Sequence, residues 1–437
     1  MKHLKAIALL IVICTAFSCQ CTPVRYETPQ EGSEGDDSGS GAAAVDTVFL
    51  ITLTGEDCPY ADKADYGFYV PAGIKRLQGV LVLQHGCGME QFGITRNYDL
   101  QYRAFARKWN LAVVETALHG PCGVWCNPES GSADGLLKAL YMAGRKTSHS
   151  ELSSLPWLLW GHSAGGYWVL AMLRDYPERI IAGVCYSAAW DPSWDYSDAA
   201  AEVPVLLRHA GIDDGDASSK CPETAHHTFD KLRTMGAPAS IVLNKGQNHN
   251  LSYLRTMAIP FWEAALKQRL TGSGSLKPLD KSQIWLGDTT TFEIYREEGF
   301  TADKHAMCRF PDRASAEAWR EFATTNCVVD KTPPEAPYAL QVIPQGEVLQ
   351  LTWQAEADIE SGIQCFNVYK DGQLAGRIPE TGVFQSFDFN GDNTYPVPPP
   401  AMSFRLTGSS GAKMRLGVEA VNRDGLHSTI TEIYYKP

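Results

Sequence analysis

The chain has few positive charges, and its content of glycine and proline is below that of collagen-like or low-complexity sequences. Its 437 residues carry 38 Lys and Arg against 50 Asp and Glu, so the net charge is -12. This deficit of positive charge argues against a nucleic-acid partner, because a phosphate backbone would be repelled. With 38 Gly and 25 Pro, the chain also lacks the composition of collagen or of low-complexity sequence. Aromatic residues make up 10%, which excludes a wholly disordered chain. At about 150 residues per domain, the length of the chain predicts about three folded units.

The apolar run near the N-terminus is too short to span a bilayer. Lys2 and Lys5 precede this run, residues 6–16, and small residues follow it. A spanning helix needs about 20 apolar residues, whereas a short positive region, an apolar stretch and small residues are typical of a secretory signal. We therefore expect residues 1–18 to be a signal peptide that is removed on export.

The exit from this run, residues 16–19, resembles a bacterial lipobox that ends at Cys19. The resemblance implies that Cys19 is lipid-modified and anchors the protein at the cell envelope, with plain secretion as the alternative. Gln20 stands where Asp would retain such a protein at the inner membrane, so the outer membrane is the expected location. Residues 19–45 that follow are acidic and rich in Gly and Ser, which predicts a flexible tether.

Cysteine usage agrees with export. The chain has twelve Cys, and removing the one in the signal and Cys19 leaves ten, an even number. In an oxidising compartment disulfides are then the first expectation, and Cys122 with Cys126 and Cys308 with Cys327 are the attractive local pairs, although spacing alone does not fix the connectivity. No pair has the CxxC spacing that would support zinc, so we expect no metal.

Short apolar runs separated by stretches of helical length occupy the first two thirds of the chain. Runs of this kind are typical of βαβ units whose parallel strands are buried on both faces. We therefore predict an α/β domain over residues 46–330, in which 275–330, with a helix at 314–324, is either a subdomain or an appendage on the sheet. The predicted strands are 48–53, 67–70, 79–84, 111–117, 155–160, 180–186, 203–209 and 239–244.

A proline-rich break at residues 330–337 separates this region from a different pattern. Beyond the break the apolar residues alternate with polar ones, turn residues lie between the runs, and no long helical stretch occurs. The strand-like segments are 339–343, 347–353, 365–369 and 414–421. Short strands at this spacing predict a small all-β sandwich over residues 331–437.

The sandwich sequence also resembles a known family. Residues 351–353 (LTW), 361–363 (SGI), 368–372 (VYKDG) and 418–422 (VEAVN) together are similar to a fibronectin type III domain. Leu416 departs from that pattern, which usually has Tyr at this position of the penultimate long strand. The segment contains no catalytic set, so the resemblance implies a spacer or a module that contacts a glycan or a protein.

The sharpest chemical motif is residues 161–166, GHSAGG, between the predicted strand 155–160 and a helical stretch at 167–174. A nucleophile elbow requires this context, because its Ser sits on a strained turn where flanking glycines let the backbones pass closely. The motif predicts Ser163 as a nucleophile. The alternative is a Gly-rich turn in which Ser163 only caps the helix.

Partners for such a serine follow in the chain order Ser, Asp, His. The strand at 203–209 leads to Asp213 and Asp214, either of which stands where a triad takes its carboxylate. Counting from Gly211 favours Asp214, whereas counting from the start of the strand favours Asp213, and both stay open. His249 follows the next strand in a loop, which predicts it as the general base.

The oxyanion of an acyl-transfer intermediate needs preorganised N–H donors. One candidate is the backbone N–H of Ala164, directly after the nucleophile. The second comes from the loop after the strand 79–84, at Cys87 or Gly88, because a His-Gly pair after an early strand is the usual position for this donor.

Aromatic residues near the same rim suggest a substrate surface. Trp190 and Trp194 follow the strand 180–186, and Trp125 follows the strand 111–117 beside two cysteines. Indole rings at a pocket mouth can stack on a sugar or phenolic ring. The alternative is that these side chains only pack a lid against the domain.

Taken together, residues 80–88 (VLVLQHGCG), the elbow at 161–166, the acid after 203–209 and residues 246–250 (GQNHN) resemble the α/β-hydrolase superfamily. Within it the chain is similar to polyhydroxybutyrate depolymerases and to feruloyl and acetyl xylan esterases. The resemblance implies ester hydrolysis by Ser163 without a cofactor, on a small or polymeric ester such as an acylated polysaccharide or a polyester. A serine peptidase and a non-catalytic surface-binding lipoprotein are the alternatives.

Overall fold

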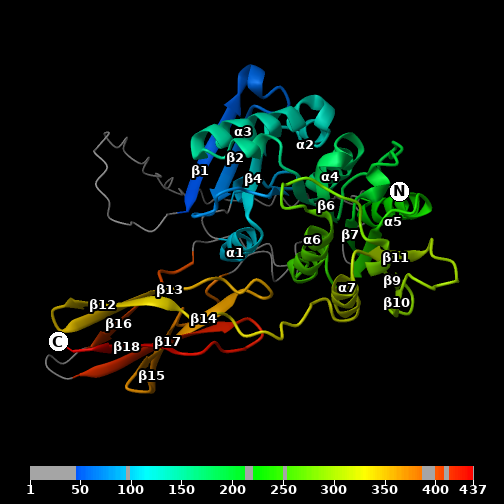
Figure 1. Ribbon diagram of the computed structural model, residues 1–437. Coiled ribbons are helices and arrows are strands. Elements are labelled where there is room, and N and C mark those ends of the chain that lie inside the picture. The colour runs from blue at the N-terminus through cyan, green and yellow to red at the C-terminus, as the bar shows by residue number, and fades with distance from the viewer. Residues whose placement is uncertain are drawn as a thin grey trace, which may run out of the picture. The chain divides into compact units, whose positions relative to one another are not determined.

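A computed structural model of the chain describes residues 46–94, 99–211, 220–249, 253–385, 399–407 and 413–436 (Figure 1). The expectations for the signal peptide, the Cys19 anchor and the tether lie outside these residues, as do Asp213 and Asp214. In the part of the chain that is described, no helix is both long and apolar enough to cross a membrane.

The first large element is a sheet of eight strands in the order β1-β2-β4-β3-β5-β6-β7-β8. All pairings from β4 through β8 are parallel, whereas β1 pairs antiparallel with β2 and β2 antiparallel with β4. The strands are β1 (Thr47–Thr54), β2 (Lys63–Val70), β3 (Gly79–Gln84), β4 (Leu111–His119), β5 (Trp157–His162), β6 (Ile180–Tyr186), β7 (Val205–Ala210) and β8 (Ala239–Asn244). The predicted mostly parallel sheet is thereby confirmed.

Helices cover both faces of this sheet (Figure 1). Strands β3, β5, β6 and β7 are buried at every residue, which explains why their sequences are continuous apolar runs rather than alternating ones. Trp262 of α6 packs on Tyr102 and Phe105 of α1, and Trp168 of α4 donates to Ser132 of α3. The helices are α1 (Leu100–Trp109), α2 (Cys122–Trp125), α3 (Ser132–Thr147), α4 (Ala164–Asp175), α5 (Cys221–Thr234) and α6 (Arg255–Arg269).

The segment after α6 packs on the edge of the large sheet. It forms a three-stranded antiparallel sheet of β9 (Trp285–Asp288), β10 (Ile294–Arg296) and β11 (Met307–Phe310), followed by α7 (Arg313–Thr325). Trp319 of α7 donates its indole N–H to the carbonyl oxygen of Ile241 in β8, at 2.8 Å. Cys308, Phe310 and Trp319 belong to the same hydrophobic core as the large sheet, so this segment is an appendage with a shared core.

The C-terminal segment has its own core between two antiparallel sheets. One sheet contains β12 (Tyr338–Gln345), β13 (Val348–Gln354) and β16 (Ser403–Thr407). The other contains β14 (Ile363–Lys370), β15 (Gln373–Ile378), β17 (Met414–Asn422) and β18 (Thr431–Tyr435). Leu351 and Trp353 from the first sheet pack with Phe366 and Val418 from the second, which is the layering of a sandwich.

The cysteines differ from the expected local pairs. The disulfide found among the described residues joins Cys87 to Cys122, whose Cα atoms are 5.4 Å apart. Cys126, the expected partner of Cys122, is buried as a free thiol, and Cys308 and Cys327 are not joined either. The pairing predicted from spacing was wrong, because α2 carries Cys122 against the loop after β3 while Cys126 at the end of the same turn enters the core. The other described thiols outside a disulfide are those of Cys58, Cys185 and Cys365, and the Cys221 thiol lies close to His249.

Candidate active site

Ser163 lies on the turn between β5 and α4 with a backbone that an L-residue rarely adopts. Its φ is 55° and its ψ is -116°. A non-glycine residue held in such a conformation costs about 1–3 kcal/mol and persists only where the surrounding structure enforces it. The Ser163 side chain makes no capping hydrogen bond to α4. The reading of Ser163 as a simple helix cap is therefore not supported, and the turn has the geometry of a nucleophile elbow.

The glycines of the motif are required by the close crossing of strand and helix. A Cβ atom on Gly161 would lie 2.0 Å from the carbonyl oxygen of Gly165. A Cβ atom on Gly165 would in turn lie 2.4 Å from the carbonyl oxygen of Gln84 and 2.6 Å from that of His85. The first turn of α4 consequently sits directly against the backbone at the end of β3, where the predicted oxyanion loop begins.

The loop after β8 brings His249 to the elbow. The ring centres of His162 and His249 are 4.8 Å apart, and His162 immediately precedes Ser163. The Nε2 atom of His162 lies 2.8 Å from the carbonyl oxygen of His249, so its N–H donates to that oxygen. His162 therefore shapes the elbow and at the same time holds the backbone of the predicted base.

The predicted acids Asp213 and Asp214 lie outside the described residues, in the segment between the end of β7 at Ala210 and the start of α5 at Cys221. The flank of this segment is placed: the Sγ atom of Cys221 is 3.7 Å from Nδ1 of His249. Nδ1 is the atom through which a triad histidine binds its carboxylate. Cys221, the first residue of α5, therefore lies beside that atom.

The loop after β3 passes close to the nucleophile. A Cβ atom on Gly86 would lie 3.2 Å from Cβ of Ser163 and 2.9 Å from Nδ1 of His162. Cys87 and Gly88, the predicted second oxyanion donors, follow directly and are exposed. Ala164, the other predicted donor, is the first residue of α4, where backbone N–H groups have no partner within the helix. The structure therefore brings Ala164 and the start of the loop that carries Cys87 and Gly88 to the same elbow.

Two anchors hold this loop in place. On its outer side Cys87 is bonded to Cys122 of α2. On its inner side His85 is buried, its Nδ1 lies 2.5 Å from the carbonyl oxygen of Gly86, and its Nε2 accepts from the backbone N–H of Leu118 at 2.8 Å. Burial lowers the pKa of His85 to about 4, so the imidazole is neutral at pH 7, with the proton on Nδ1.

The predicted substrate aromatics occupy different environments. Trp190 is 42% exposed, and its ring meets Tyr167 of α4 edge-on with centres 5.5 Å apart. Trp194 is partly buried, contacts the same Tyr167 at 5.1 Å, and lies 4.6 Å beneath the Arg174 guanidinium. Trp125 differs from the expectation, because it is fully buried and packs on His85 instead of lining a surface. Its indole supports the loop after β3 from within.

The aromatic pair is tied to the nucleophile through the backbone. The carbonyl oxygen of Ser163 accepts from the N–H of Ala189, which precedes Trp190, and from the N–H of Tyr167, both at 3.1 Å. Tyr167 is thus hydrogen-bonded to the Ser163 carbonyl directly, and Trp190 follows a residue that is. The backbone that carries both partly exposed rings is therefore held next to the nucleophile. Tyr167 is a contact that the sequence reading missed, since an aromatic residue in an amphipathic helix gives no signal of its own.

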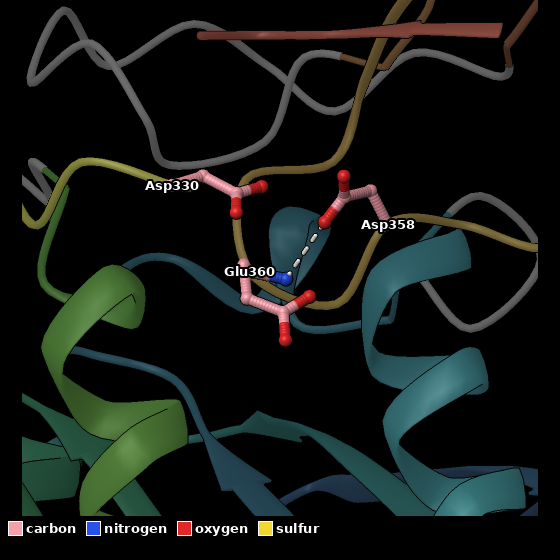
Figure 2. Close-up of side chains that lie close together, drawn as sticks. All are labelled: Asp330, Asp358 and Glu360. Atoms are coloured by element: carbon pink, nitrogen blue, oxygen red, sulfur yellow. Dashed lines mark hydrogen bonds between the residues drawn. The ribbon is translucent and has the colours of Figure 1, made fainter. Parts of the chain in front are cut away.

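A candidate cation site lies where the stretch before β12 meets the connection from β13 to β14 (Figure 2). Among the described residues, Asp330, Asp358 and Glu360 form the group whose ligand oxygens all lie within 4.8 Å of one another. Oxygen donors of this type suit Ca²⁺ or Mg²⁺. Two of the carboxylates already accept hydrogen bonds: Asn422 donates to both Asp330 and Asp358, and the backbone N–H of Glu360 donates to Asp358. Burial, and then the Asp330 carboxylate, raise the pKa of Asp358 to about 8.

Comparisons with known proteins find solved structures of related architecture at low identity. One is poly(aspartic acid) hydrolase-1 from Sphingomonas, with 15% identity over 48% of this chain and 94% of that chain and a TM-score of 0.34. Another is the fluorophosphonate-binding serine hydrolase F of Staphylococcus aureus, with 15% identity over 50% and 96% and a TM-score of 0.33. A dienelactone hydrolase from Anabaena variabilis has 18% identity over 47% and 88% and a TM-score of 0.30.

No protein-family model and no curated protein matches the chain. At TM-scores of this size the likeness assigns no activity. The functional conclusion therefore rests on the geometry around Ser163.

Proposed function

We propose that the protein is a serine hydrolase that cleaves carboxylic esters through an acyl-enzyme. The observation that carries this proposal is Ser163 on its strained elbow, with the His249 loop held against it by His162. A strained serine turn would be an expensive feature to retain in a fold that needed only a helix cap. The glycines around it allow the close approach that a nucleophile on such a turn and its oxyanion donors require.

In the proposed reaction Oγ of Ser163 attacks the ester carbonyl carbon while His249 accepts the hydroxyl proton. The tetrahedral oxyanion accepts hydrogen bonds from backbone N–H groups of Ala164 and of Cys87 or Gly88, which can lower the barrier by several kcal/mol. The C–O bond to the alcohol then breaks, and the alcohol leaves with the proton from His249. Water, deprotonated by His249, attacks the acyl-enzyme and releases the acid and the free serine.

Hydrolysis of p-nitrophenyl acetate and butyrate by the mature chain tests this function. Ser163→Ala should remove turnover without loss of the folded state, because the residue is small and its side chain makes no cap bond. Far-UV circular dichroism of the variant supplies the control for folding. Equal activity in the two proteins would exclude Ser163 as the nucleophile, and inactivity in both would favour a binding lipoprotein.

The carboxylate of the triad is proposed to be Asp214, with Asp213 as the alternative. Both precede Cys221 in the chain, and the Sγ atom of Cys221 lies 3.7 Å from Nδ1 of His249. The Asn variant of the true acid should lose about 10⁴-fold in kcat, since a neutral amide at this place favours the wrong imidazole tautomer. The other variant should stay near wild type. Full activity in both variants would exclude either residue as the orienting acid.

The exposed faces of Trp190 and Tyr167 are proposed to receive a planar or ring-shaped part of the ester, such as a sugar or a phenolic group. Stacking on an aromatic face contributes about 0.5–1.5 kcal/mol beyond burial. Trp190→Ala should therefore lower kcat/KM about 3- to 10-fold on esters of aromatic acids or acetylated oligosaccharides and leave p-nitrophenyl acetate nearly unchanged. An equal loss on every ester would indicate a structural role for the ring.

The remaining proposals concern placement in the cell. We propose that Cys19 carries the lipid anchor at the cell envelope, with the outer membrane as the location. The C-terminal sandwich is proposed to be a fibronectin type III-like module that spaces the catalytic part or contacts a glycan or protein. Partition of the full chain into detergent, compared with Cys19→Ala, tests the anchor: a variant that partitions like wild type would exclude lipidation at this residue.

A further inference from the structure

A buried arginine stands near the end of β7, a strand that begins with three apolar residues. Arg208 lies in β7, between Leu207 and His209, and has no exposed surface. Removing a guanidinium from water is costly unless its donors find acceptors, and buried charges are tolerated where they are fully hydrogen-bonded. The place of Arg208 in the sheet is therefore best understood through the atoms that its side chain binds.

The guanidinium binds the ends of the two neighbouring strands and the loop that carries His249. Nη1 donates to the hydroxyl of Ser187, directly after β6, at 2.6 Å. Nε and Nη2 donate to Oδ1 of Asn244, the last residue of β8, at 3.3 and 2.9 Å. Nη2 also donates to the carbonyl oxygen of Asn248 at 3.1 Å, and the guanidinium lies 4.3 Å over the ring of Tyr186.

The loop is held at a second, adjacent point. The carbonyl oxygen of His249 accepts from Nε2 of His162, whose ring also meets Tyr186 edge-on with centres 5.6 Å apart. Two consecutive carbonyl groups, those of Asn248 and His249, are thus bound by side chains that are rooted in β7 and β5. With both peptides fixed, the direction in which the His249 side chain leaves the backbone is fixed as well.

The same strand ends support the nucleophile. The backbone N–H of Ser163 donates to the carbonyl oxygen of Tyr186 at 2.8 Å, and the N–H of Ser187 donates to the carbonyl oxygen of Arg208 at 2.8 Å. Tyr186 therefore contacts both the guanidinium and the backbone of Ser163, and Ser187 binds Arg208 through its side chain and its backbone. A continuous set of hydrogen bonds and ring contacts runs from the nucleophile through Arg208 to the residue before the base.

From this geometry we infer that Arg208 is a positioning residue that sets the distance between the His249 imidazole and the Ser163 hydroxyl. The inference rests on the proposed hydrolase function. Arg208 is bound to the carbonyl before His249 and to the strand end beside Ser163, so it acts through these residues and takes no part in the chemical step itself. Its loss should leave substrate binding intact and allow the base to drift from the hydroxyl.

Arg208→Met and Arg208→Lys, assayed with p-nitrophenyl butyrate, test the inference. Arg208→Met should lower kcat about 100-fold, the effect of a misplacement of about 1 Å, with KM within about 3-fold of wild type. Arg208→Lys should recover part of kcat, because an ammonium can still donate to one or two of the acceptors. The rate of Ser163 labelling by a fluorophosphonate should fall in parallel with kcat.

The chain offers a matched control in Arg269 of α6, which is also buried. Its Nη1 donates to the carbonyl oxygens of Ile180 and Ile181, at 2.7 and 2.8 Å, at the opposite end of β6. Arg269→Met removes a buried guanidinium and leaves two carbonyl oxygens without that donor. It should therefore lower the melting temperature about as much as Arg208→Met does. Because those carbonyls lie at the far end of the strand, kcat and the labelling rate should stay within about 2-fold of wild type.

All variants are compared at a temperature where circular dichroism shows them folded, and Arg208→Lys carries the test if Arg208→Met does not fold. An unchanged kcat in the folded Arg208 variants would overturn the inference, as would an equal loss of kcat in Arg269→Met. A failure of the proposed function is distinguishable from both results. In that case the wild type itself neither turns over the ester nor reacts with the phosphonate.

Discussion

At the scale of single residues, the site depends on side chains that are neutral or fixed by burial. His85 is the clearest case, since it sits under the loop after β3 and accepts from Leu118. Its pKa is lowered to about 4 by burial, against about 6.5 for an exposed histidine. The imidazole must therefore stay unprotonated for the loop to keep this hydrogen bond.

This pKa has a consequence for stability in acid. Between pH 6.5 and pH 4 the unfolded chain binds a proton at His85 that the folded chain does not bind, so stability falls as the pH drops through this window. The full effect is about 3 kcal/mol. We expect the difference in unfolding free energy between wild type and His85→Gln, measured in urea, to decrease by about this amount from pH 7 to pH 4. Parallel curves for the two proteins would refute a titration of His85 in this range.

At the scale of elements, the Cys87–Cys122 disulfide joins the loop after β3 covalently to α2. The bond closes a segment of 35 residues, which in a chain-entropy description stabilises the fold by about 3–4 kcal/mol. It also restrains the backbone that carries Cys87 and Gly88, the proposed oxyanion donors. Stability and transition-state stabilisation should therefore decline together when it is lost.

Cys122→Ser should lower the midpoint of urea unfolding and reduce kcat on p-nitrophenyl butyrate about 10-fold, less than the 10²- to 10³-fold loss of a whole donor. Reductant should do the same to the wild type and nothing further to the variant. Cys327→Ser is the matched control, because that thiol is free and belongs to the appendage. A wild-type kcat in Cys122→Ser would show that the loop keeps its place without the bond.

Most strands of the large sheet could be predicted from the sequence, because their burial is reflected in their composition. Strands such as β3, β5 and β6 are buried on both faces, so their residues form continuous apolar runs with turns between them. The environment of single side chains was less readable. Whether Trp125 faces solvent, and which thiol meets Cys122, depends on how α2 packs on a loop some 35 positions away.

Arg208 is a second residue whose environment could not be predicted from the sequence. An arginine within the run VPVLLRH is visible as a charge in an apolar strand, but only the fold shows that its acceptors come from the ends of β6 and β8. The order Ser, Asp, His along the chain led to Ser163 and His249, and the structure places both at one edge of the sheet. The assignment of Asp213 or Asp214 stays a prediction.

At the scale of the whole molecule, two separate hydrophobic cores predict two unfolding transitions with opposite responses to pH. The part built on the eight-stranded sheet, which contains His85, loses stability in acid. In the sandwich, the carboxyl of Asp358 is buried beside Asp330 and has its pKa raised to about 8 (Figure 2). Between pH 4 and pH 8 the folded sandwich therefore binds a proton that the unfolded chain has released, so its stability falls as the pH rises.

Asp358→Asn should remove this slope, because the amide supplies permanently what the protonated carboxyl supplies at low pH. In scanning calorimetry of the full chain at pH 8, one of the two transitions should lie at a higher temperature in Asp358→Asn than in wild type. At pH 4 the two proteins should melt at the same temperatures. Asp371→Asn is a suitable control, since Asp371 is an exposed carboxylate on the turn after β14. A wild-type sandwich that melts at the same temperature at pH 4 and pH 8 would argue against a proton on Asp358.

The most direct measurement for the proposed function is reaction of the mature chain with a fluorophosphonate, followed by mass spectrometry of the intact protein and of its peptides. An activated serine should gain a single adduct, mapped to Ser163, and p-nitrophenyl butyrate turnover should disappear in step with labelling. Ser163→Ala should gain none. An unlabelled wild type, or an adduct on another residue with turnover lost, would contradict the assignment of Ser163 as the nucleophile of an ester hydrolase.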